Sequence, residues 1–474
     1  MRKKAKWFFI LPLGLILVVY LSLVGFLYLS EKSFFTDSNP EDSVYFRSMK
    51  THSVTLIDDG LASLAKRIEL IDKAQKTLDL EYFIYELDLS SQLITRKLIT
   101  AAKRGVKVRL LVDFSAPVFK LKPHFARELS LYGIDVRYYN TTSLLRFISV
   151  QHRSHRKLLI MDGTSVITGG RNVGDDYFNL SAHYNFLDSD VLIEGEIVGA
   201  ILKGFDRYWE SNLSTIPDIS DELKSEGDGN FFSSELPEVT NAFEHLEKQK
   251  DSIAILNYQS SCGDLTYATD LPGVAVQNRR VFKELSKFLD SAESEIVGET
   301  PYFVLRPDGL DLLRTTIAKG IKATILTNSL ESTDAFYTVS ALALTLDQIA
   351  TAGVDLRVFN GNRPQDVNML ADKVTLKWGV HAKRAVVDGK HLLIGTYNVD
   401  PRSANLNSEL LIICRNQPDL ASFARESILR RTKDSTKLFA RDSAWSELIK
   451  TEDTTKQLLF YLALPLAYVF DFLL

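Results

Sequence analysis

The amino-acid sequence predicts an α/β protein made of two similar halves, one a duplicate of the other, behind an N-terminal transmembrane helix. Three observations support this prediction: an internal repeat, one short motif present in both copies, and an uncharged run near the N-terminus. The chain has 474 residues. At roughly 100–200 residues per domain, this length accommodates a duplicated domain.

The N-terminal segment has the composition of a membrane anchor. Basic residues at positions 2, 3, 4 and 6 precede an uncharged run from Trp7 to Leu29. As a helix rising about 1.5 Å per residue, this run crosses a hydrocarbon core of about 30 Å. A cleaved signal peptide is the alternative, but its apolar core is usually only about 7–15 residues long and ends in an A-x-A-like site. We therefore expect residues 1–30 to form a cytoplasmic basic tip and anchor, with the rest outside.

The composition disfavours two other classes of protein. The formal net charge is −4, which argues against a protein that binds nucleic acid mainly through a basic surface. The only cysteines are Cys262 and Cys414, which are too few for a four-cysteine zinc site or a disulfide framework. Whether these two cysteines are paired stays open at this point.

The body of the chain alternates predicted helices and strands, and the pattern occurs twice. Each feature of the first copy returns 215–220 residues later. The repeated features are Glu81 and Glu299, Gly105 and Gly320, and residues 132–137 and 352–357. Such a repeat predicts one duplicated domain.

The domain boundaries follow from this repeat and from changes in composition. We expect a stalk at 31–50, the first half at 51–215, a polar linker at 216–250 and the second half at 251–445. Within the tail at 446–474, the apolar stretch from Leu458 to Leu474 is interrupted by Pro465 and Asp471 and is too short to span a bilayer comfortably. It either lies at the membrane interface or packs on the domain, and the sequence favours neither reading.

One motif, His-x-Lys-x4-Asp followed by glycine and asparagine, occurs at the same spacing in both copies. From average residue usage, one such match arises by chance in about one chain in 10⁴, so two matches at equivalent places in a repeat are not accidental. The candidate catalytic residues are His155, Lys157 and Asp162 in the first copy and His381, Lys383 and Asp388 in the second. The asparagines that follow them are Asn172 and Asn398.

The spacing has a physical meaning. A strand places residues i and i+2 on one face, so each histidine points with its lysine. Asp162 and Asp388 each precede a glycine between two apolar runs, a hairpin-turn signal that favours a structural role over a catalytic one. The glycines at 169, 170 and 395 allow close approach to a ligand.

Imidazole, ammonium and amide groups together make a site for a tetrahedral oxyanion such as phosphate, with Asn172 and Asn398 as its amide donors. Two copies around a pseudo-twofold axis place histidines on opposite sides of one phosphorus. This arrangement suits in-line displacement, with one histidine as nucleophile and the other as general acid.

At these residues the chain resembles the phospholipase D superfamily, and more narrowly the C-type branch of the bacterial cardiolipin synthases. The stretches that carry the narrower resemblance are residues 169–178, 325–330 and 398–403. The resemblance implies the phospholipase D fold, in which two α/β/α halves related by a pseudo-twofold axis share one active site, a covalent phosphohistidine intermediate, and neither a metal nor another cofactor. It implies His155 as the nucleophile and His381 as the acid. It also implies a histidine-orienting carboxylate downstream of each motif, matched here by Asp190 and Glu409.

These observations predict a phosphatidyltransferase that makes cardiolipin from phosphatidylglycerol, with phosphatidylethanolamine left open as the donor. The predicted location is the bacterial cytoplasmic membrane, with a single-pass anchor and the catalytic domain on the outer or periplasmic side. A membrane-anchored phospholipase D that uses water as acceptor would have the same catalytic residues. A membrane-tethered phosphodiesterase or nuclease and a non-catalytic lipid-binding protein are weaker alternatives, and no nucleic-acid partner is expected.

Overall fold

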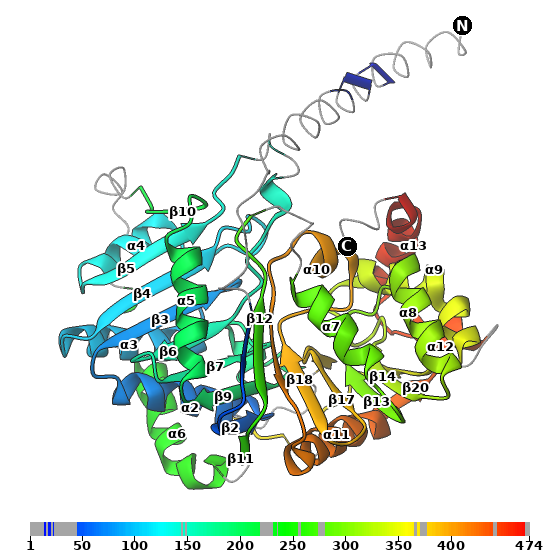
Figure 1. The fold of residues 1–474 in the computed structure, drawn as a ribbon. Helices are drawn as coiled ribbons and strands as arrows, with labels where there is room; N and C mark the ends of the chain where they lie inside the picture. The colour runs from blue at the N-terminus through cyan, green and yellow to red at the C-terminus, as the bar shows by residue number, and fades with distance from the viewer. Residues whose placement is uncertain are drawn as a thin grey trace, which may run out of the picture.

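The computed structural model describes residues 45–469, with gaps at 144–145, 147–148, 219–230, 235, 255–256, 274–279, 365–366, 370–376 and 439–442, and a few residues between 14 and 22. These residues form two nine-stranded sheets that lie side by side with helices around them (Figure 1). A separate two-stranded sheet joins the halves.

The first sheet is built mainly from the N-terminal half. Its order is β10 (Ser214–Thr215), β5 (Ile134–Tyr139), β4 (Lys107–Asp113), β3 (Thr77–Tyr82), β6 (Leu158–Met161), β7 (Ser165–Gly169), β9 (Asp190–Glu194), β2 (His52–Ile57) and β11 (Tyr258–Cys262). The strands β3, β4 and β5 are parallel, and the others pair antiparallel. Valine, leucine and isoleucine dominate the central strands, as expected for strands buried on both faces.

The second sheet repeats this plan. Its order is β1 (Tyr45–Ser48), β12 (Leu265–Thr269), β19 (Leu410–Cys414), β18 (His391–Gly395), β17 (Arg384–Val387), β13 (Glu295–Glu299), β14 (Lys322–Asn328), β15 (Asp355–Phe359) and β20 (Ser435–Lys437). The parallel strands are again the three that alternate with helices, β13, β14 and β15. The predicted duplication of an α/β domain is therefore confirmed, strand by strand.

Helices cover the sheets. Those of the first half and the linker are α2 (Gly60–Lys73), α3 (Leu89–Lys103), α4 (Pro123–Ser130), α5 (Ile197–Trp209) and α6 (Pro237–Ala254). Those of the second half are α7 (Arg280–Asp290), α8 (Pro307–Ala318), α9 (Phe336–Ala352), α10 (Pro401–Asn405), α11 (Pro418–Arg431), α12 (Ser443–Leu448) and α13 (Thr454–Val469). The predicted helix–glycine–strand junctions lie where expected, since Gly105 and Gly320 follow α3 and α8 with positive φ values of 95° and 85°.

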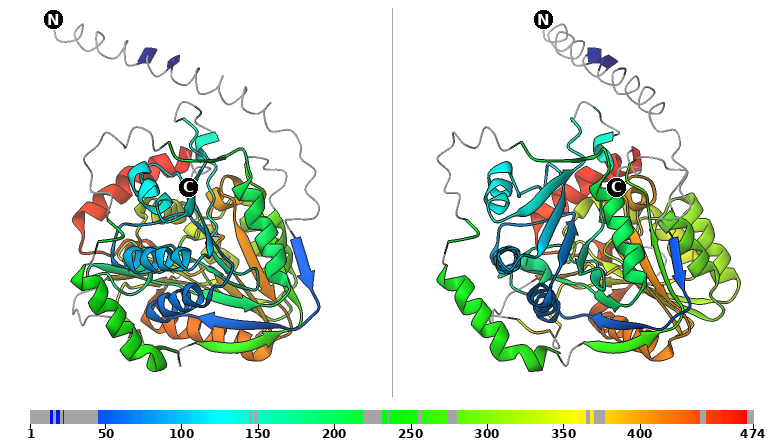
Figure 2. Two further views of the ribbon diagram at one scale, coloured as in Figure 1. Left: turned by 90° about the vertical axis from the view of Figure 1, so that its left-hand side faces the viewer. Right: turned by 60° about the vertical axis from the view of Figure 1, so that its left-hand side comes forward.

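The two halves exchange strands at their boundary. β1 comes from the predicted stalk but pairs with β12 of the second sheet, whereas β11 pairs with β2 of the first. A disulfide between Cys262 on β11 and Cys414 on β19 ties the two sheets together. Part of the predicted linker is helix α6, which packs against α2 and α3 (Figure 2).

Three large apolar clusters stabilise this arrangement. One lies between the first sheet and α2, α3 and α6, and a second lies between the second sheet and α7, α8 and α9. The third joins residues of both sheets with α5 and α11. Because this shared cluster is continuous across both sheets, burial of apolar surface holds the halves together and fixes how their motifs meet.

The structure describes much of the predicted C-terminal tail but almost none of the predicted N-terminal anchor. The predicted anchor, Trp7 to Leu29, falls almost wholly outside the described residues, and no helix among the described residues is long and apolar enough to cross a membrane. At the C-terminus, α13 packs against α9, with Phe460 and Ala467 buried. Packing of the tail on the domain, one of the two readings, is therefore what the structure shows for its described part.

Candidate active site

A cavity of about 810 Å³ lies where the two halves meet, and both copies of the motif contribute to it. His155, His381, Asn172 and Asn398 all line it. Aromatic and apolar side chains from both halves form much of the remaining wall: Phe83, Phe114, Val118, Tyr177, Tyr302 and Tyr337. The cavity therefore combines a polar centre with apolar walls.

Backbone pairing between the halves positions the two histidines. Strand β16 (Lys377–Val380) runs parallel to β8 (Tyr184–Leu187), and the His381 amide donates a hydrogen bond of 2.8 Å to the Leu187 carbonyl. Across the pseudo-twofold axis, the His155 amide donates a hydrogen bond of 2.9 Å to the Ser408 carbonyl. Each motif is thus held by the half to which it does not belong.

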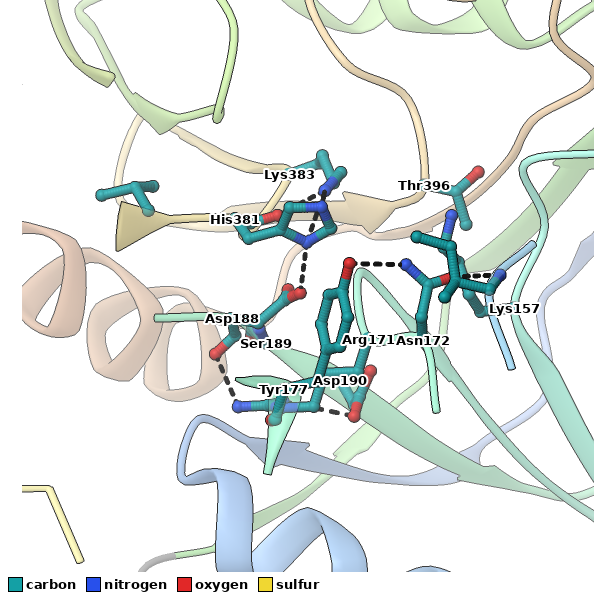
Figure 3. A network of polar contacts seen from close by, with 12 residues as sticks. Lys157, Arg171, Asn172, Tyr177, Asp188, Ser189, Asp190, His381, Lys383 and Thr396 are labelled. Carbon is teal, nitrogen blue, oxygen red and sulfur yellow. Dashed lines mark hydrogen bonds and ion pairs between the residues drawn. The ribbon is translucent and has the colours of Figure 1, made fainter. Parts of the chain in front are cut away.

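The residue after each of these carbonyls is a carboxylate that reaches the histidine. Asp188 Oδ2 lies 2.6 Å from His381 Nδ1, and both carboxylate oxygens of Glu409 lie 3.1 Å from His155 Nδ1 (Figure 3 shows the Asp188 pair). A carboxylate on Nδ1 fixes the tautomer that leaves Nε2 free for chemistry. Glu409 therefore has the predicted orienting role in geometry, but toward the histidine of the other half.

The prediction for Asp190 is wrong, because this carboxylate contacts no histidine. Its Oδ2 accepts hydrogen bonds from Arg67 Nη1 at 2.9 Å and Arg171 Nη1 at 3.2 Å, inside the first half. Asp188, two residues earlier, is the structural counterpart of Glu409. The equivalent glycines Gly169 and Gly395 pair with Asp190 and Leu411. Asp188 and Glu409 each lie two residues before these strand partners, so they occupy equivalent positions.

The glycines after the motifs serve these carboxylate segments rather than a ligand, contrary to the expectation from the sequence. A Cβ on Gly170 would lie 2.1 Å from Asp188 Oδ1. A Cβ on Gly395 would lie 2.3 Å from the carbonyl oxygen of Leu410, the residue after Glu409. A larger residue at position 170 would meet the Asp188 carboxylate itself, and one at position 395 would meet the backbone that follows Glu409.

Both lysines are buried beside the histidines. Lys383 Nζ lies 3.0 Å from His381 Nε2, and Lys157 Nζ donates a hydrogen bond of 2.6 Å to the His155 carbonyl. Burial lowers the pKa of Lys383 to about 8, even though Asp188 and Glu409 act in the opposite direction. Burial and the charge of Lys383 hold the pKa of Lys157 well below its usual range. A bound phosphate would favour the charged form of both ammonium groups.

Burial favours the neutral form of both histidines. Burial, followed by the charge of Lys383, lowers the pKa of His381 to about 4, and burial also holds the pKa of His155 well below its usual range. Burial alone would raise the pKa of Asp188, but His381 holds it well below its usual range, whereas burial raises the pKa of Glu409 to about 7. A neutral imidazole is the form that can act as a nucleophile.

The two asparagines line the cavity near the histidines, as predicted. Asn172 accepts a hydrogen bond of 3.1 Å from the Ile84 amide and donates one of 2.9 Å to the Tyr177 hydroxyl. Asn398 is buried, and within the described part of the chain its carbonyl oxygen has no hydrogen-bond partner. Unpartnered buried polar atoms are uncommon in native proteins; this side-chain oxygen can accept a hydrogen bond from a ligand hydroxyl, whereas only the amide nitrogen of Asn398 could donate to a phosphate oxygen.

Two features of this site were missed by sequence reasoning. The first is Asp188, which lies in the same short segment as Asp190. Arg402 lines the cavity and adds a cation, within a stretch whose resemblance to a known family had been noted without a role for the residue. Among the described residues, no group of three or more histidine, cysteine, aspartate or glutamate side chains is arranged to hold a metal ion.

Asp162 and Asp388 lie in the hairpin turns and away from the cavity. Asp162 accepts backbone hydrogen bonds from residues 75, 76 and 77 at 2.9, 2.7 and 2.8 Å. Asp388 does the same for residues 293, 294 and 295. Each aspartate thus ties its turn to the start of the neighbouring parallel strand, and the structural reading of these two positions fits the geometry.

Replacement of Asp162 by asparagine is expected to lower stability and leave catalysis intact. Asparagine tolerates the positive φ of 52° at this position, so the change removes mainly the charge that accepts three amides. The free energy of unfolding should fall by about 1–3 kcal/mol, while kcat stays within about twofold of wild type. Denaturant unfolding and turnover measured on the same preparation test this, and a large loss of kcat in a folded variant would contradict it.

Comparison with known proteins gives the family. A sequence model described as "Cardiolipin synthase, PLD-like domain" matches residues 67–209 and 285–429, which are the two halves of the repeat. The chain belongs to the phospholipase D-like cardiolipin synthase family. Cardiolipin synthase C of Escherichia coli K12 is 30% identical over 391 residues, covering 76% of this chain and 81% of that protein. The resemblance noted in the sequence is confirmed.

A second relative and a solved structure agree with this assignment of family and fold, respectively. The major cardiolipin synthase of Bacillus subtilis is 26% identical over 381 residues, covering 78% of this chain and 68% of that protein. Among solved structures, phosphatidylserine synthase of Haemophilus influenzae superimposes with a TM-score of 0.63 at 14% identity, over 89% of this chain and 95% of that one. The fold expected from the motif is therefore the fold found.

Proposed function

We propose that this protein is a cardiolipin synthase that transfers a phosphatidyl group to a hydroxyl of phosphatidylglycerol. The observation that carries the proposal is the pair of histidines that line one cavity, each oriented by a carboxylate from the opposite half. Family membership, with relatives named as cardiolipin synthases over most of the chain, supports the choice of product.

The reaction proceeds as a double displacement. His155 Nε2 attacks the phosphorus of the donor phospholipid and forms a phosphorus–nitrogen bond, while the bond to the head-group oxygen breaks. His381 gives its proton to that oxygen, so the head-group alcohol leaves neutral. The negative charge of the bound phosphodiester raises the pKa of His381 and allows it to carry this proton.

The second displacement reverses the first with a different alcohol. His381 accepts the proton of a phosphatidylglycerol hydroxyl, whose oxygen attacks the phosphatidyl-histidine and releases His155. Lys157, Lys383, Asn172 and Asn398 surround the phosphoryl oxygens and stabilise the charge that develops on them. The donor is a phospholipid such as phosphatidylglycerol, with phosphatidylethanolamine as the second candidate.

Supplying the purified protein with labelled phosphatidylethanolamine, with and without phosphatidylglycerol, tests the nature of the acceptor; labelled phosphatidylglycerol, which can serve as its own acceptor, is supplied in a separate sample. A synthase should give labelled cardiolipin that depends on phosphatidylglycerol. Formation of phosphatidic acid alone in both samples would show that water is the acceptor and that the protein is a phospholipase D. An oligonucleotide substrate in a parallel sample should remain intact.

The activity of such an enzyme should fall as the pH rises through about 8. Lys383 loses its proton near this pH, and the phosphate then loses a cation beside it. The pH profile of kcat/KM reports ionisations of the free enzyme. Lys383→Arg, which stays charged at these pH values, should be slower but should lose the decline near pH 8. Persistence of that decline in the variant would assign it to another group.

We further propose that the enzyme is a single-pass protein of the bacterial cytoplasmic membrane, with its catalytic halves on the outer side. The basic tip and the apolar run from Trp7 to Leu29 support the anchor and its direction. The disulfide between Cys262 and Cys414 supports an oxidising compartment. A second contact with the bilayer is available on α13, where large apolar side chains on the side away from α9 are 55–78% exposed: Leu458, Tyr461, Leu462, Leu466 and Tyr468.

The pair of changes Leu462→Asp and Leu466→Asp should weaken activity on membranes. Each aspartate replaces an apolar side chain that would be buried in the bilayer by a charged one. Activity on phosphatidylglycerol vesicles should therefore fall by about tenfold or more. Activity on short-chain phosphatidylglycerol dispersed below its micelle concentration should be unchanged. Leu131→Asp, at an equally exposed apolar residue in the other half, is the matched control. Equal losses on both substrates would remove α13 from the membrane contact.

A further inference from the structure

A second cavity, of about 150 Å³, lies in the second half between the sheet and the helices α7 and α8. Its walls are almost wholly apolar and include Phe282, Leu285, Leu313 and Ile325. The three residues from the helices are only partly buried, which shows that the cavity reaches the surface between α7 and α8. The catalytic scheme does not use this space.

At the equivalent place in the first half, larger side chains occupy the positions that line this cavity. In the first sheet, Leu80 on β3 lies between Leu110 on β4 and Leu159 on β6, and all three are fully buried. In the second sheet, the same positions are Gly298 on β13, Ile325 on β14 and Ala385 on β17. Two of the three leucines are thus replaced by glycine and alanine.

The small residues are not required by the backbone. Gly298 does not have a positive φ, and a Cβ placed on it would meet its nearest neighbours at 3.4 Å, an ordinary contact distance. Protein interiors are close-packed, and an unfilled volume of this size destabilises a core. The core of the second half therefore contains an unfilled volume at positions where the core of the first half has larger side chains. Because an unfilled volume lowers stability, its presence indicates a function.

The cavity is a close neighbour of the active site. Lys383, whose ammonium group contacts His381, also lines it. Phe303 and Val399 line this cavity, while the adjoining residues Tyr302 and Asn398 line the catalytic one. The two spaces are therefore separated by little more than one layer of residues.

We propose that this cavity binds part of an acyl chain, so that one chain of a phospholipid is held behind the catalytic lysine of the second half. An apolar cavity with few polar groups holds water poorly and takes up hydrocarbon. The identity of the chain as part of a substrate rests on the proposed function, whereas binding of hydrocarbon by the cavity does not. A free fatty acid presents the same chemistry as a phospholipid chain.

Photo-crosslinking in the full-length protein tests the proposal without requiring turnover. The probes are a phosphatidylglycerol and a free fatty acid, each with a diazirine near the chain end. We expect crosslinks to residues of α7, α8 and β13, and Gly298→Leu, which restores the side chain of the first half, should reduce them at least fivefold. Ala385→Leu is the second variant that fills the cavity. Leu80→Val, at the equivalent position of the first half, is the control that should leave the crosslinking yield unchanged.

The outcomes separate the possibilities. Labelling of these elements by the phosphatidylglycerol probe, lost in Gly298→Leu and Ala385→Leu while the melting temperature stays equal or rises, supports a phospholipid chain in the cavity. Labelling by the fatty-acid probe alone supports the cavity as a site for a free acyl chain. Absence of labelling there, or labelling that both filling variants leave unchanged, overturns the proposal. Failure of the proposed function is recognised separately, as wild-type protein that binds the probe but makes no cardiolipin.

Discussion

Replacement of His155 by alanine is expected to reduce the rate of cardiolipin formation by about 10⁴-fold or more. The imidazole is the nucleophile in the proposed scheme, and loss of a nucleophile leaves only the binding and oxyanion contributions to catalysis. Purified wild-type and variant proteins, assayed with labelled phosphatidylglycerol in the same vesicles, give the comparison. The same variant should form no acid-labile phosphatidyl-protein adduct after a rapid quench.

The choice of nucleophile is tested by the symmetric change and by a control. His381→Ala should also be slow, but it can still form the adduct, because His155 with its partner Glu409 is intact. His391→Ala, at a histidine on β18 outside the cavity lining, should retain full activity. If His381→Ala formed no adduct and His155→Ala did, the two histidines would have the opposite roles.

The second large effect separates two neighbouring carboxylates. Asp188→Asn is expected to lower kcat by about 10²–10⁴-fold, because an amide can donate to His381 Nδ1 and stabilise the wrong tautomer. Asp190→Asn is expected instead to lower the free energy of unfolding by about 3–5 kcal/mol, since it leaves Arg67 and Arg171 without their buried counter-charge. One substitution thus affects mainly catalysis and the other mainly stability.

Measurement of turnover and of denaturant unfolding for both variants checks this separation. The pH profile adds a readout that a purely structural role would not change, because the ionisation of His381 depends on the charge of Asp188. Rescue of turnover by Asp188→Glu would support the orienting role. A stable Asp190→Asn protein with the larger loss of turnover would contradict the assignment and restore the expectation from the sequence.

Much of the catalytic centre could be predicted because it is encoded by short, local spacing. His155 and Lys157 lie in the segment directly before β6 and not in the strand itself, yet their i, i+2 spacing still brings the lysine beside the histidine, and the Asp-Gly pairs specify the turns that hold Asp162 and Asp388. Repetition of the pattern supplied the pseudo-twofold axis and the two-half fold. Each of these features depends on residues close together in the chain.

What could not be predicted depends on contacts between the halves. The segments before Asp188 and Glu409 bind the backbone of the opposite motif, so each histidine takes its carboxylate from the other half. Spacing within one copy contains no information on that exchange. The pairing of β7 with β9 places Gly169 opposite Asp190 and thereby identifies Asp188 as the counterpart of Glu409. This register is a property of the folded sheet and does not follow from spacing along the chain.

The pairing of Cys262 with Cys414 was left open for the same reason. β11 lies in the part of the chain assigned to the second half, yet it joins the edge of the first sheet. Cys262 therefore lies at the edge of the first sheet, where it forms the disulfide with Cys414 of the second sheet. The difference beside Gly298 likewise becomes clear only when the two folded copies are compared. Gly298 and Ala385 occupy the positions that Leu80 and Leu159 occupy in the first half.

The lipid composition of a cardiolipin-deficient bacterial strain that expresses this protein tests the central claim most directly. Cardiolipin should reappear with the wild-type protein and should be absent with an equally expressed, membrane-bound His155→Ala variant. Absence of cardiolipin in the strain with the wild-type protein, or equal amounts with the variant, would contradict the assignment of this site as a cardiolipin synthase.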